Sequence, residues 1–217
     1  MYSDDPSQLQ EIYLFLPSLR RSLRLSSSAR CSPLLGSDYV QDDNANEFGI
    51  QASNFKMTLL GRKKVLTQLH ENANAADSAN FTTQGGFPSW PKPVVGKWEV
   101  RDVYVVDVFP LPAMGHYCYG HRVLFIDRQT WNIVASDLYD PQDKFWKTIL
   151  LFWHPVKVPS GESVVLPLTG ANIVADFQNS HMGLSPQYVI HTGDDVPLKY
   201  RDASVMAFPG SLSQVMQ

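Results

Sequence analysis

The residues from Lys97 to Phe109 read KWEVRDVYVVDVF. Apolar side chains occupy alternate positions, at Trp98, Val100, Tyr104, Val106 and Val108. Charged side chains occupy positions between them, at Glu99, Arg101 and Asp107. Because successive side chains of a strand point to opposite faces, this alternation predicts a strand of an antiparallel sheet, with the apolar set buried and the charged set solvated.

Three comparable stretches follow with short connections, at Tyr119–Asp127, Trp131–Tyr139 and Lys144–Trp153. The connecting residues 127–130 and 140–143 contain the Asp, Pro and polar residues that tight turns use. The sequence therefore predicts an antiparallel meander. Weaker strand patterns occur at Ser163–Leu166, Ile173–Phe177 and Gln187–Ile190.

The chain upstream of the meander contains further strand patterns. Ile12–Leu16 is apolar throughout, and Leu19–Leu25 has polar residues at every second position of its centre, so the two segments predict a hairpin. Asn54–Leu60 and Lys64–His70 flank a glycine and predict a second hairpin, with a short helix over residues 65–70 as the alternative.

Two segments are rich in residues that interrupt regular structure. Ser26–Asp43 contains Ser, Asp, Gly and Pro and predicts an irregular connection. Glu71–Pro93 contains Asn, Ala, Ser and Gly followed by three prolines, and predicts a long surface loop. The expected fold is therefore mainly β, with few short helices and long loops.

Length and composition limit the class of protein. A chain of 217 residues with 44% hydrophobic and 18% charged residues forms one domain, residues 1–217, with a substantial core. Its net charge of −3 excludes the basic surface expected of a nucleic-acid-binding domain. No apolar run approaches the roughly 18 residues of a membrane helix, so we expect no spanning segment.

The first residues of the chain indicate whether the sequence has a segment upstream. No export signal is present in the numbered chain, and a strand pattern begins soon after Met1. We expect that the chain is the C-terminal part of a longer protein.

Common catalytic motifs are absent, including the nucleophile elbow, the phosphate loop, the Rossmann glycines and His-Glu-x-x-His. His116, Cys118 and His121 could bind zinc, but their spacing matches no standard site. Cys118 with His121 as base is a weaker alternative, because no third group orients the base. The sequence therefore predicts a non-catalytic protein without a metal or cofactor.

Two charged clusters have an ordinary and a functional interpretation. Asp38, Asp42 and Asp43 could coordinate calcium, although a solvated turn is the stronger prediction. Three arginines, Arg20, Arg21 and Arg24, are candidates to bind a phosphate or carboxylate head group. For these side chains, too, ordinary solvation is the stronger prediction. Cys31 and Cys118 allow one disulfide or two buried thiols.

Two separated parts of the chain resemble a known family. Residues 12–25, IYLFLPSLRRSLRL, with 31–39, CSPLLGSDY, are similar to the signature of bacterial outer-membrane lipoprotein-sorting proteins. Residues 96–105, GKWEVRDVYV, and 119–131, YGHRVLFIDRQTW, resemble one branch, domain-of-unknown-function family 1329. The resemblance extends from about Asp4 to at least Trp153.

The resemblance implies a fold and a compartment. Members are about twice this length, carry an export signal and share the fold of periplasmic lipoprotein carriers, a curved antiparallel sheet that forms an incomplete barrel. It implies that this chain is the C-terminal half, in the periplasm or associated with the outer membrane. Because the relatives are exported, we expect Cys31 and Cys118 to form a disulfide.

The resemblance and the apolar sheet together predict a function. The chain offers few helices to cover its sheet, so we expect a lipid or lipoprotein acyl chain to fill that role, in a carrier that could serve an envelope transporter. The predicted ligand-binding residues are Trp98, Tyr104, Val106, Phe125 and Trp146. The alternative is a scaffold protein that pairs with another subunit and has no small ligand.

Overall fold

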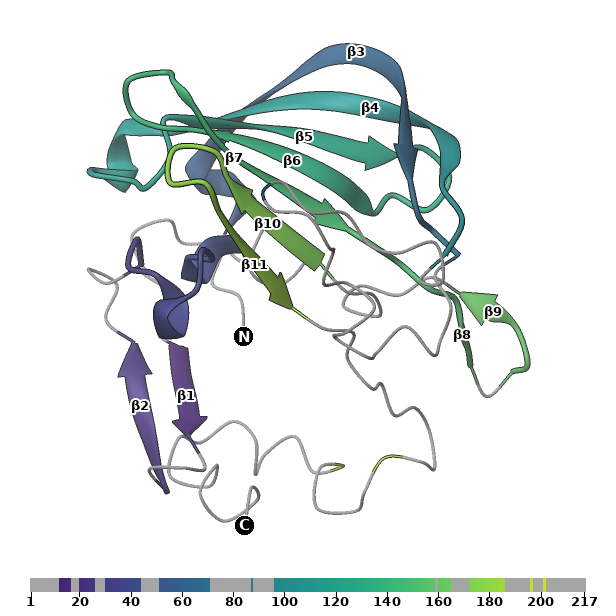
Figure 1. Cartoon of the computed structure of the whole chain (residues 1–217), viewed down its shortest axis with the longest axis horizontal. Helices are drawn as coiled ribbons and strands as arrows, with labels where there is room; N and C mark the ends of the chain where they lie inside the picture. The colour runs from purple at the N-terminus through teal and green to yellow at the C-terminus, as the bar shows by residue number, and fades with distance from the viewer. Residues whose placement is uncertain are drawn as a thin grey trace.

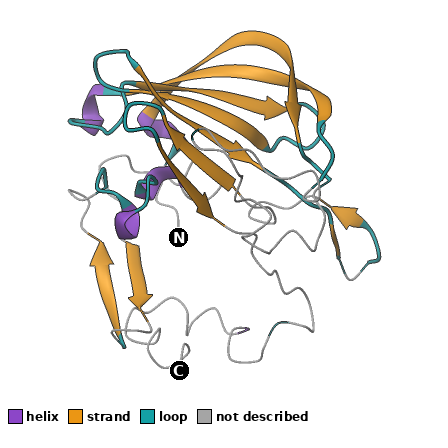
Figure 2. Cartoon of the chain, in the orientation of Figure 1, coloured by secondary structure: helices purple, strands orange, loops and turns teal. Residues whose placement is uncertain are grey.

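A computed structural model describes residues 12–16, 20–25, 30–43, 51–70, 96–158, 160–164 and 172–185, together with residues 87, 196 and 201. Strands dominate this part of the chain (Figures 1 and 2). The helices assigned here are single 3-10 turns: η3 (Leu34–Gly36), η4 (Gln41–Asp43), η5 (Ala52–Asn54) and η8 (Pro112–Met114). The predicted mainly β fold is confirmed.

One antiparallel sheet of seven strands forms the body of the molecule, in the order β11-β10-β7-β6-β5-β4-β3. Its strands are β3 (Phe55–Thr67), β4 (Glu99–Pro110), β5 (His121–Asp127), β6 (Ile133–Tyr139), β7 (Phe145–Leu151), β10 (Asn172–Asp176) and β11 (His181–Ser185). The sheet is curved and not closed, consistent with an incomplete barrel (Figure 1).

Two small hairpins accompany the sheet. β1 (Ile12–Leu16) pairs with β2 (Arg21–Leu25), which confirms the predicted hairpin, and Figure 1 shows it below the sheet. β8 (Val156–Lys157) pairs with β9 (Ser163–Val164). β9 lies within the predicted strand Ser163–Leu166. Residues 165 and 166, residues 187–190 and the loop 71–93, except Phe87, lie outside the described residues.

The meander from β4 to β7 is confirmed, because each of these strands pairs with the next. The predicted hairpin around Gly61 is wrong, and so is the alternative helix over residues 65–70. Residues 55–67 form one continuous strand that pairs with β4 along its whole length. The register shifts between Leu59 and Gly61, which marks a bulge, and Gly61 has φ 144°. Glycine tolerates this backbone conformation, so the strand bends there and does not reverse.

The pairing register defines two faces of the sheet, because directly paired residues lie on the same face. The Leu124 face contains one row across the strands: Leu59, Val106, Leu124, Ser136, Ile149 and Val174. The Phe125 face contains the neighbouring row: Gly61, Val105, Phe125, Ala135, Leu150 and Ile173.

Burial along β4 differs from the prediction. The alternation is present, but Val103 and Val105, which lie among the charged positions, are buried, whereas Val100 is 62% exposed. The Leu124 face of β4 is therefore buried at Val108 and open at Val100. The prediction of one buried face along the whole strand is wrong, because the curved sheet is covered over only part of this face.

The segment 30–43 forms this cover. Tyr39 and Val40 are buried in the main core cluster, and the Lys147 ammonium on β7 donates to the Asp38 carbonyl oxygen at 2.6 Å. A Cβ atom at Gly183 on β11 would lie 3.3 Å from the Tyr39 ring, so the segment packs closely on this part of the sheet. At the other end of the sheet, the Trp153 N–H donates to the Gln68 carbonyl oxygen at 2.9 Å, which joins the end of β7 to the end of β3.

Candidate functional site: an open apolar patch

Four large apolar side chains are exposed on the Leu124 face of β3 and β4. Met57, Leu59, Leu66 and Val100 are 45%, 61%, 62% and 62% exposed. Leu66 is directly opposite Val100, so these two side chains are neighbours on the face. We call these four residues the open patch. They form two groups on this face, Met57 with Leu59 and Leu66 with Val100, and the charged residues Arg62 and Lys64 lie between the groups on β3. Exposed apolar side chains that gather on one face of two paired strands are a candidate binding surface.

The open patch continues onto β5 through half-buried side chains. Val106 lies between Leu59 on β3 and Leu124 on β5, and Tyr104 is paired with Ile126. The patch thus borders directly on the packed core. Arg62, Lys64 and Asp102 lie on the same face between Leu59 and Leu66, so an apolar ligand that extends along β3 and β4 would pass these charged side chains.

An aromatic pair stands beside the open patch. The Tyr104 ring stacks on Trp131 with a centroid separation of 5.6 Å, and Trp131 is 68% exposed. Arg128 places its guanidinium carbon 5.5 Å from the centroid of the Tyr104 ring. The stacked pair and the guanidinium give the patch an amphipathic border, because aromatic faces attract cations.

The structure does not bring the five predicted ligand-binding residues together. Tyr104 and Val106 lie on the Leu124 face next to the open patch, whereas Phe125 is opposite Val105 on the other face. Trp98 precedes β4 and contacts Phe152 edge to face at 5.9 Å. Trp146 lies near the opposite strand end and donates from Nε1 to Asp176 Oδ2 at 2.9 Å.

The three predicted head-group arginines belong to the small hairpin. Arg20 lies in the turn before β2 with φ 49°, and Arg24 is exposed on β2. Arg21 is the first residue of β2 and pairs with Leu16. Figure 1 shows this hairpin apart from β3 and β4, so the arginines do not border the open patch.

Sequence reasoning missed β3 as part of the site. Met57, Leu59 and Leu66 were assigned to a separate hairpin, because Gly61 was taken as a turn. Residues 59–66 read LLGRKKVL and show no alternation, so the sequence contains no local signal for a continuous strand through the bulge. Arg128 was also missed, because it lies in a turn whose Asp and polar residues account for the chain reversal.

The covered half of the Leu124 face contains charge. Arg122 on β5 is 1% exposed, and its Nη2 lies 3.6 Å from Asp43 Oδ1. The Tyr119 hydroxyl donates to Asp43 Oδ2 at 2.8 Å. Arg30 Nε donates to Asp42 Oδ1 at 2.7 Å, which neutralises the other buried acid of η4. The contacts of Asp43 attach the segment 30–43 to Arg122 and Tyr119, whereas the Arg30–Asp42 pair lies within the segment.

Burial dominates the electrostatics of this half. Burial raises the pKa of Asp43, although the Arg122 charge opposes that shift. Burial likewise raises the pKa of Asp42 against the opposing effect of Arg30. Burial lowers the pKa of Lys147, opposed by the charge of Asp43. All three shifts disfavour the charged form, as expected for groups removed from water.

The expected solvated acidic turn is therefore wrong for Asp42 and Asp43, because both are buried. The calcium alternative fails as well, since each carboxylate has a different partner and Asp38 Oδ2 binds His181 Nδ1 at 2.6 Å. In the part of the chain described above, no three acidic, His or Cys side chains are placed to hold a metal ion.

Cys118 forms a disulfide with Cys31, with a Cα–Cα distance of 5.0 Å. The bond connects the covering segment to the residues that precede β5. It also removes the two weaker alternatives for Cys118, a zinc ligand and a nucleophile. His121 has other partners, Asp107 at 2.7 Å and Asp143 at 3.0 Å.

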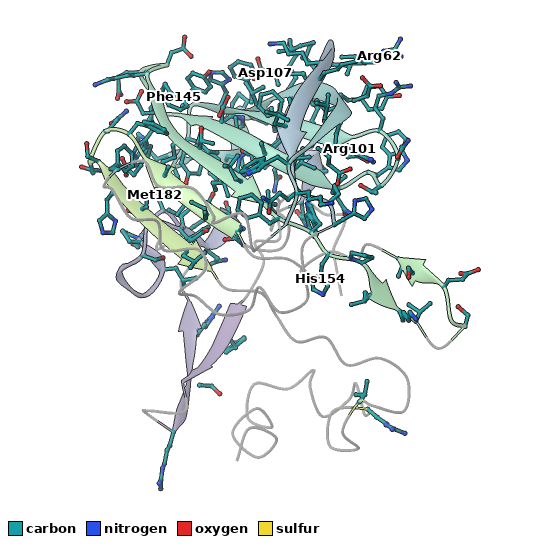
Figure 3. The ribbon with its side chains drawn as sticks, turned by 45° about the vertical axis from the view of Figure 1, so that its right-hand side comes forward. Arg62, Arg101, Asp107, Phe145, His154 and Met182 are labelled. Atoms are coloured by element: carbon teal, nitrogen blue, oxygen red, sulfur yellow. A yellow bond between two sulfur atoms is a disulfide. The ribbon has the colours of Figure 1, made fainter. Side chains whose placement is uncertain are left out.

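The Phe125 face carries a second exposed feature at the far strand ends. We call it the aromatic stripe: Phe109, His121, Tyr139, Phe145 and Phe177. Their successive ring centroids are 4.8, 4.3, 5.7 and 5.2 Å apart. The stripe lies on the Phe125 face and the open patch on the Leu124 face, and Figure 3 shows Phe145 at the left and Arg62 at the right of the sheet, so the two features are separate surfaces.

Solved structures provide the comparison for this architecture. A DUF1329 family protein from Desulfovibrio piger is similar over 91% of this chain, with 16% identity and a TM-score of 0.57. An outer membrane lipoprotein-sorting protein domain from Vibrio parahaemolyticus is similar over 86% of this chain, with 16% identity and a TM-score of 0.50. This chain covers 65% and 63% of those two chains, respectively, which is less than two thirds of each.

A search of curated proteins gives no match. None of the described helices is both long enough and apolar enough to cross a membrane. The family model described as protein of unknown function, DUF1329, matches residues 1–200. The match covers most of the chain and agrees with the resemblance seen in its sequence, and the protein therefore belongs to the DUF1329 family.

Proposed function

We propose that the protein is a non-catalytic carrier that binds a lipid or a lipoprotein acyl chain on the open patch. The observation that carries the proposal is the exposure of Met57, Leu59, Leu66 and Val100 on one face of β3 and β4. Burial of such side chains by an acyl chain would release water from both partners, at roughly 25 cal/mol for each Å² of apolar surface.

The fold supports a carrier role in general terms. The similar structures include a domain described as an outer membrane lipoprotein-sorting protein domain. The same likeness and the Cys31–Cys118 disulfide support a periplasmic or outer-membrane-associated location as part of this proposal. An envelope transporter is a suitable partner for such a carrier.

A test is available because the patch is exposed. Leu66→Ser with Val100→Thr should weaken binding of a fluorescent fatty acid about tenfold, which corresponds to about 1.4 kcal/mol. Leu111→Ser is the matched control, because Leu111 is also exposed and lies outside the patch. Equal affinities for wild type, double variant and control would reject the patch as the binding surface.

The second candidate function is that of an envelope scaffold that pairs with another subunit. The aromatic stripe favours it, since Phe109, Phe145 and Phe177 are 41%, 36% and 39% exposed, and aromatic side chains are enriched at protein interfaces. Native mass spectrometry of protein purified from its own envelope separates the two functions. A co-purifying lipid supports the carrier, and a stoichiometric protein supports the scaffold.

A further inference from the structure

A small pocket lies next to the open patch, where the end of β5 passes the beginning of β4. Its volume is about 250 Å³, and its lining residues are Val100, Arg101, Asp102, Asp127, Arg128 and Gln129. Val100 belongs to both the pocket and the patch. An amphiphile could therefore place its polar group in the pocket while its hydrocarbon lies on β3 and β4.

The charge of Arg101 is already neutralised. Its Nε donates to Asp127 Oδ2 at 2.9 Å and its Nη2 donates to Asp127 Oδ1 at 3.2 Å. The same Nη2 donates to Gln129 Oε1 at 2.7 Å. The Asp127 carboxylate also accepts the backbone N–H groups of Gln129 and Thr130. Arg101 and Asp127 thus form a rigid, internally satisfied wall of the pocket.

Arg128 is in a different situation. Among the described residues it makes no salt bridge, and its Nε is buried without a hydrogen-bond acceptor. Its guanidinium is held against the Tyr104 ring at 5.5 Å. A buried donor without an acceptor costs free energy, and a guanidinium has the geometry to bind two oxygen atoms of one anion.

The surroundings of Arg128 favour negative charge in a ligand. On the Leu124 face, Arg62 is opposite Tyr104 and Lys64 is opposite Asp102. Figure 3 shows Arg62 projecting from the upper part of β3. Asp127 is paired with Arg101, so Arg62, Lys64 and Arg128 exceed the remaining acid of the pocket lining, Asp102, although the whole chain has a net charge of −3.

We propose that the pocket binds the anionic head group, a phosphate or a carboxylate, of the amphiphile whose hydrocarbon lies on the open patch. Arg128 donates to the anion, Arg62 and Lys64 attract it, and Arg101 with Asp127 limits the size of the group. This inference rests on the proposed function. It replaces the hairpin arginines Arg20, Arg21 and Arg24 as the head-group site.

The test uses calorimetry with dodecyl phosphate, dodecanol and inorganic phosphate. Wild type should bind dodecyl phosphate about tenfold more tightly than dodecanol, a factor typical of one charge-assisted contact. Arg128→Gln should remove this preference and leave the affinity for dodecanol unchanged, which also shows that the variant is folded. Arg128→Lys should keep part of the preference, and Arg24→Gln should keep all of it.

Two outcomes would overturn the inference in distinguishable ways. If Arg128→Gln keeps the full preference for dodecyl phosphate, the head group binds elsewhere and only the pocket is rejected. If neither dodecyl compound binds wild type while inorganic phosphate binds in an Arg128-dependent manner, the pocket is a site for free anions. That second result would reject the head-group assignment and the proposed function together.

Discussion

The two halves of the Leu124 face are built in opposite ways. Over β5, β7 and β10 the face is covered by the segment 30–43, and the cover brings Asp42, Asp43 and Arg122 into the interior. Over β3 and β4 the same face is open and carries Leu59 and Leu66. Charges are thus buried where the segment 30–43 covers the sheet, and apolar groups are exposed where none of the described segments covers it.

Because the two halves of the face differ in cover, we expect the covered half to determine folding stability and the open half to be free to bind a ligand. In the covered half, removing one partner leaves an unpaired group without water, so each contact there has a large effect on folding. In the open half, the side chains already contact water, so their replacement has little effect on folding. A surface that is apolar and also unimportant for stability is available for a ligand.

The largest expected effect is in the covered half. Arg122→Met should lower the free energy of unfolding by about 3–5 kcal/mol at pH 7, because Asp43 then lacks its buried counter-charge. Urea denaturation measures this loss. Arg62→Gln is the control on β3, where the side chain is exposed and the expected change is below about 0.5 kcal/mol. Equal changes for the two variants would contradict the contrast.

The disulfide should give the next effect. Cys31→Ser with Cys118→Ser should lower the free energy of unfolding by about 2–4 kcal/mol, because the bond closes a loop across a sequence separation of 87 residues. The loss should appear as a lower urea midpoint, whereas the open patch should keep its affinity for a fluorescent fatty acid. Loss of affinity in a folded double variant would show that the cover also shapes the patch.

A smaller effect is expected at the border of the open half. Burial alone would raise the pKa of Asp127, but hydrogen bonds from Arg101 and from the N–H groups of Thr130 and Gln129 outweigh it and lower the pKa. The stabilisation is therefore present above the unfolded pKa of about 3.9 and is lost as the pH falls through the folded value.

Asp127→Asn should consequently cost about 1–3 kcal/mol at pH 7, the range for hydrogen bonds to a charged group. The difference from wild type should shrink as the pH falls below about 4, because the unfolded state binds the Asp127 proton first, and it should vanish once the pH is below the lowered folded pKa. Denaturation curves at pH 7 and pH 3 measure both values. A difference that does not change with pH would show that the Arg101 pair does not contribute through its charge.

The sequence predicted the elements better than their positions relative to one another. The meander from β4 to β7 follows from alternation and turn residues, which are local signals. The relative positions of the strands depend on β-bulges. The register shifts beside Gly61, where the two expected strands form the single strand β3, and it shifts again after Phe125. Cross-strand register determines that Phe125 lies opposite Val105, and no local pattern in either strand specifies it.

The candidate site was less predictable for the same reason. Tyr104 and Val106 were identified correctly as members of one face, but their neighbours on β3 depended on the missed strand. The sequence contains a signal for the buried acids in Arg122, a charge directly before the apolar run Val123–Ile126, because a charge buried there needs a counter-charge. Arg128 has no such signal, since its missing acceptor becomes visible only when Tyr104 and the pocket are placed.

The smallest expected effect tests the open half directly. Leu66→Ala should change the free energy of unfolding by less than about 0.5 kcal/mol, because the side chain is 62% exposed. Leu138→Ala removes the same atoms from a side chain that is 0% exposed on the same face, and should cost about 2–5 kcal/mol. The two variants therefore remove the same atoms and differ only in whether the leucine side chain is covered by the chain. A loss above about 1.5 kcal/mol for Leu66→Ala would mean that the chain itself packs on the patch, and the surface would then not be free to bind an acyl chain.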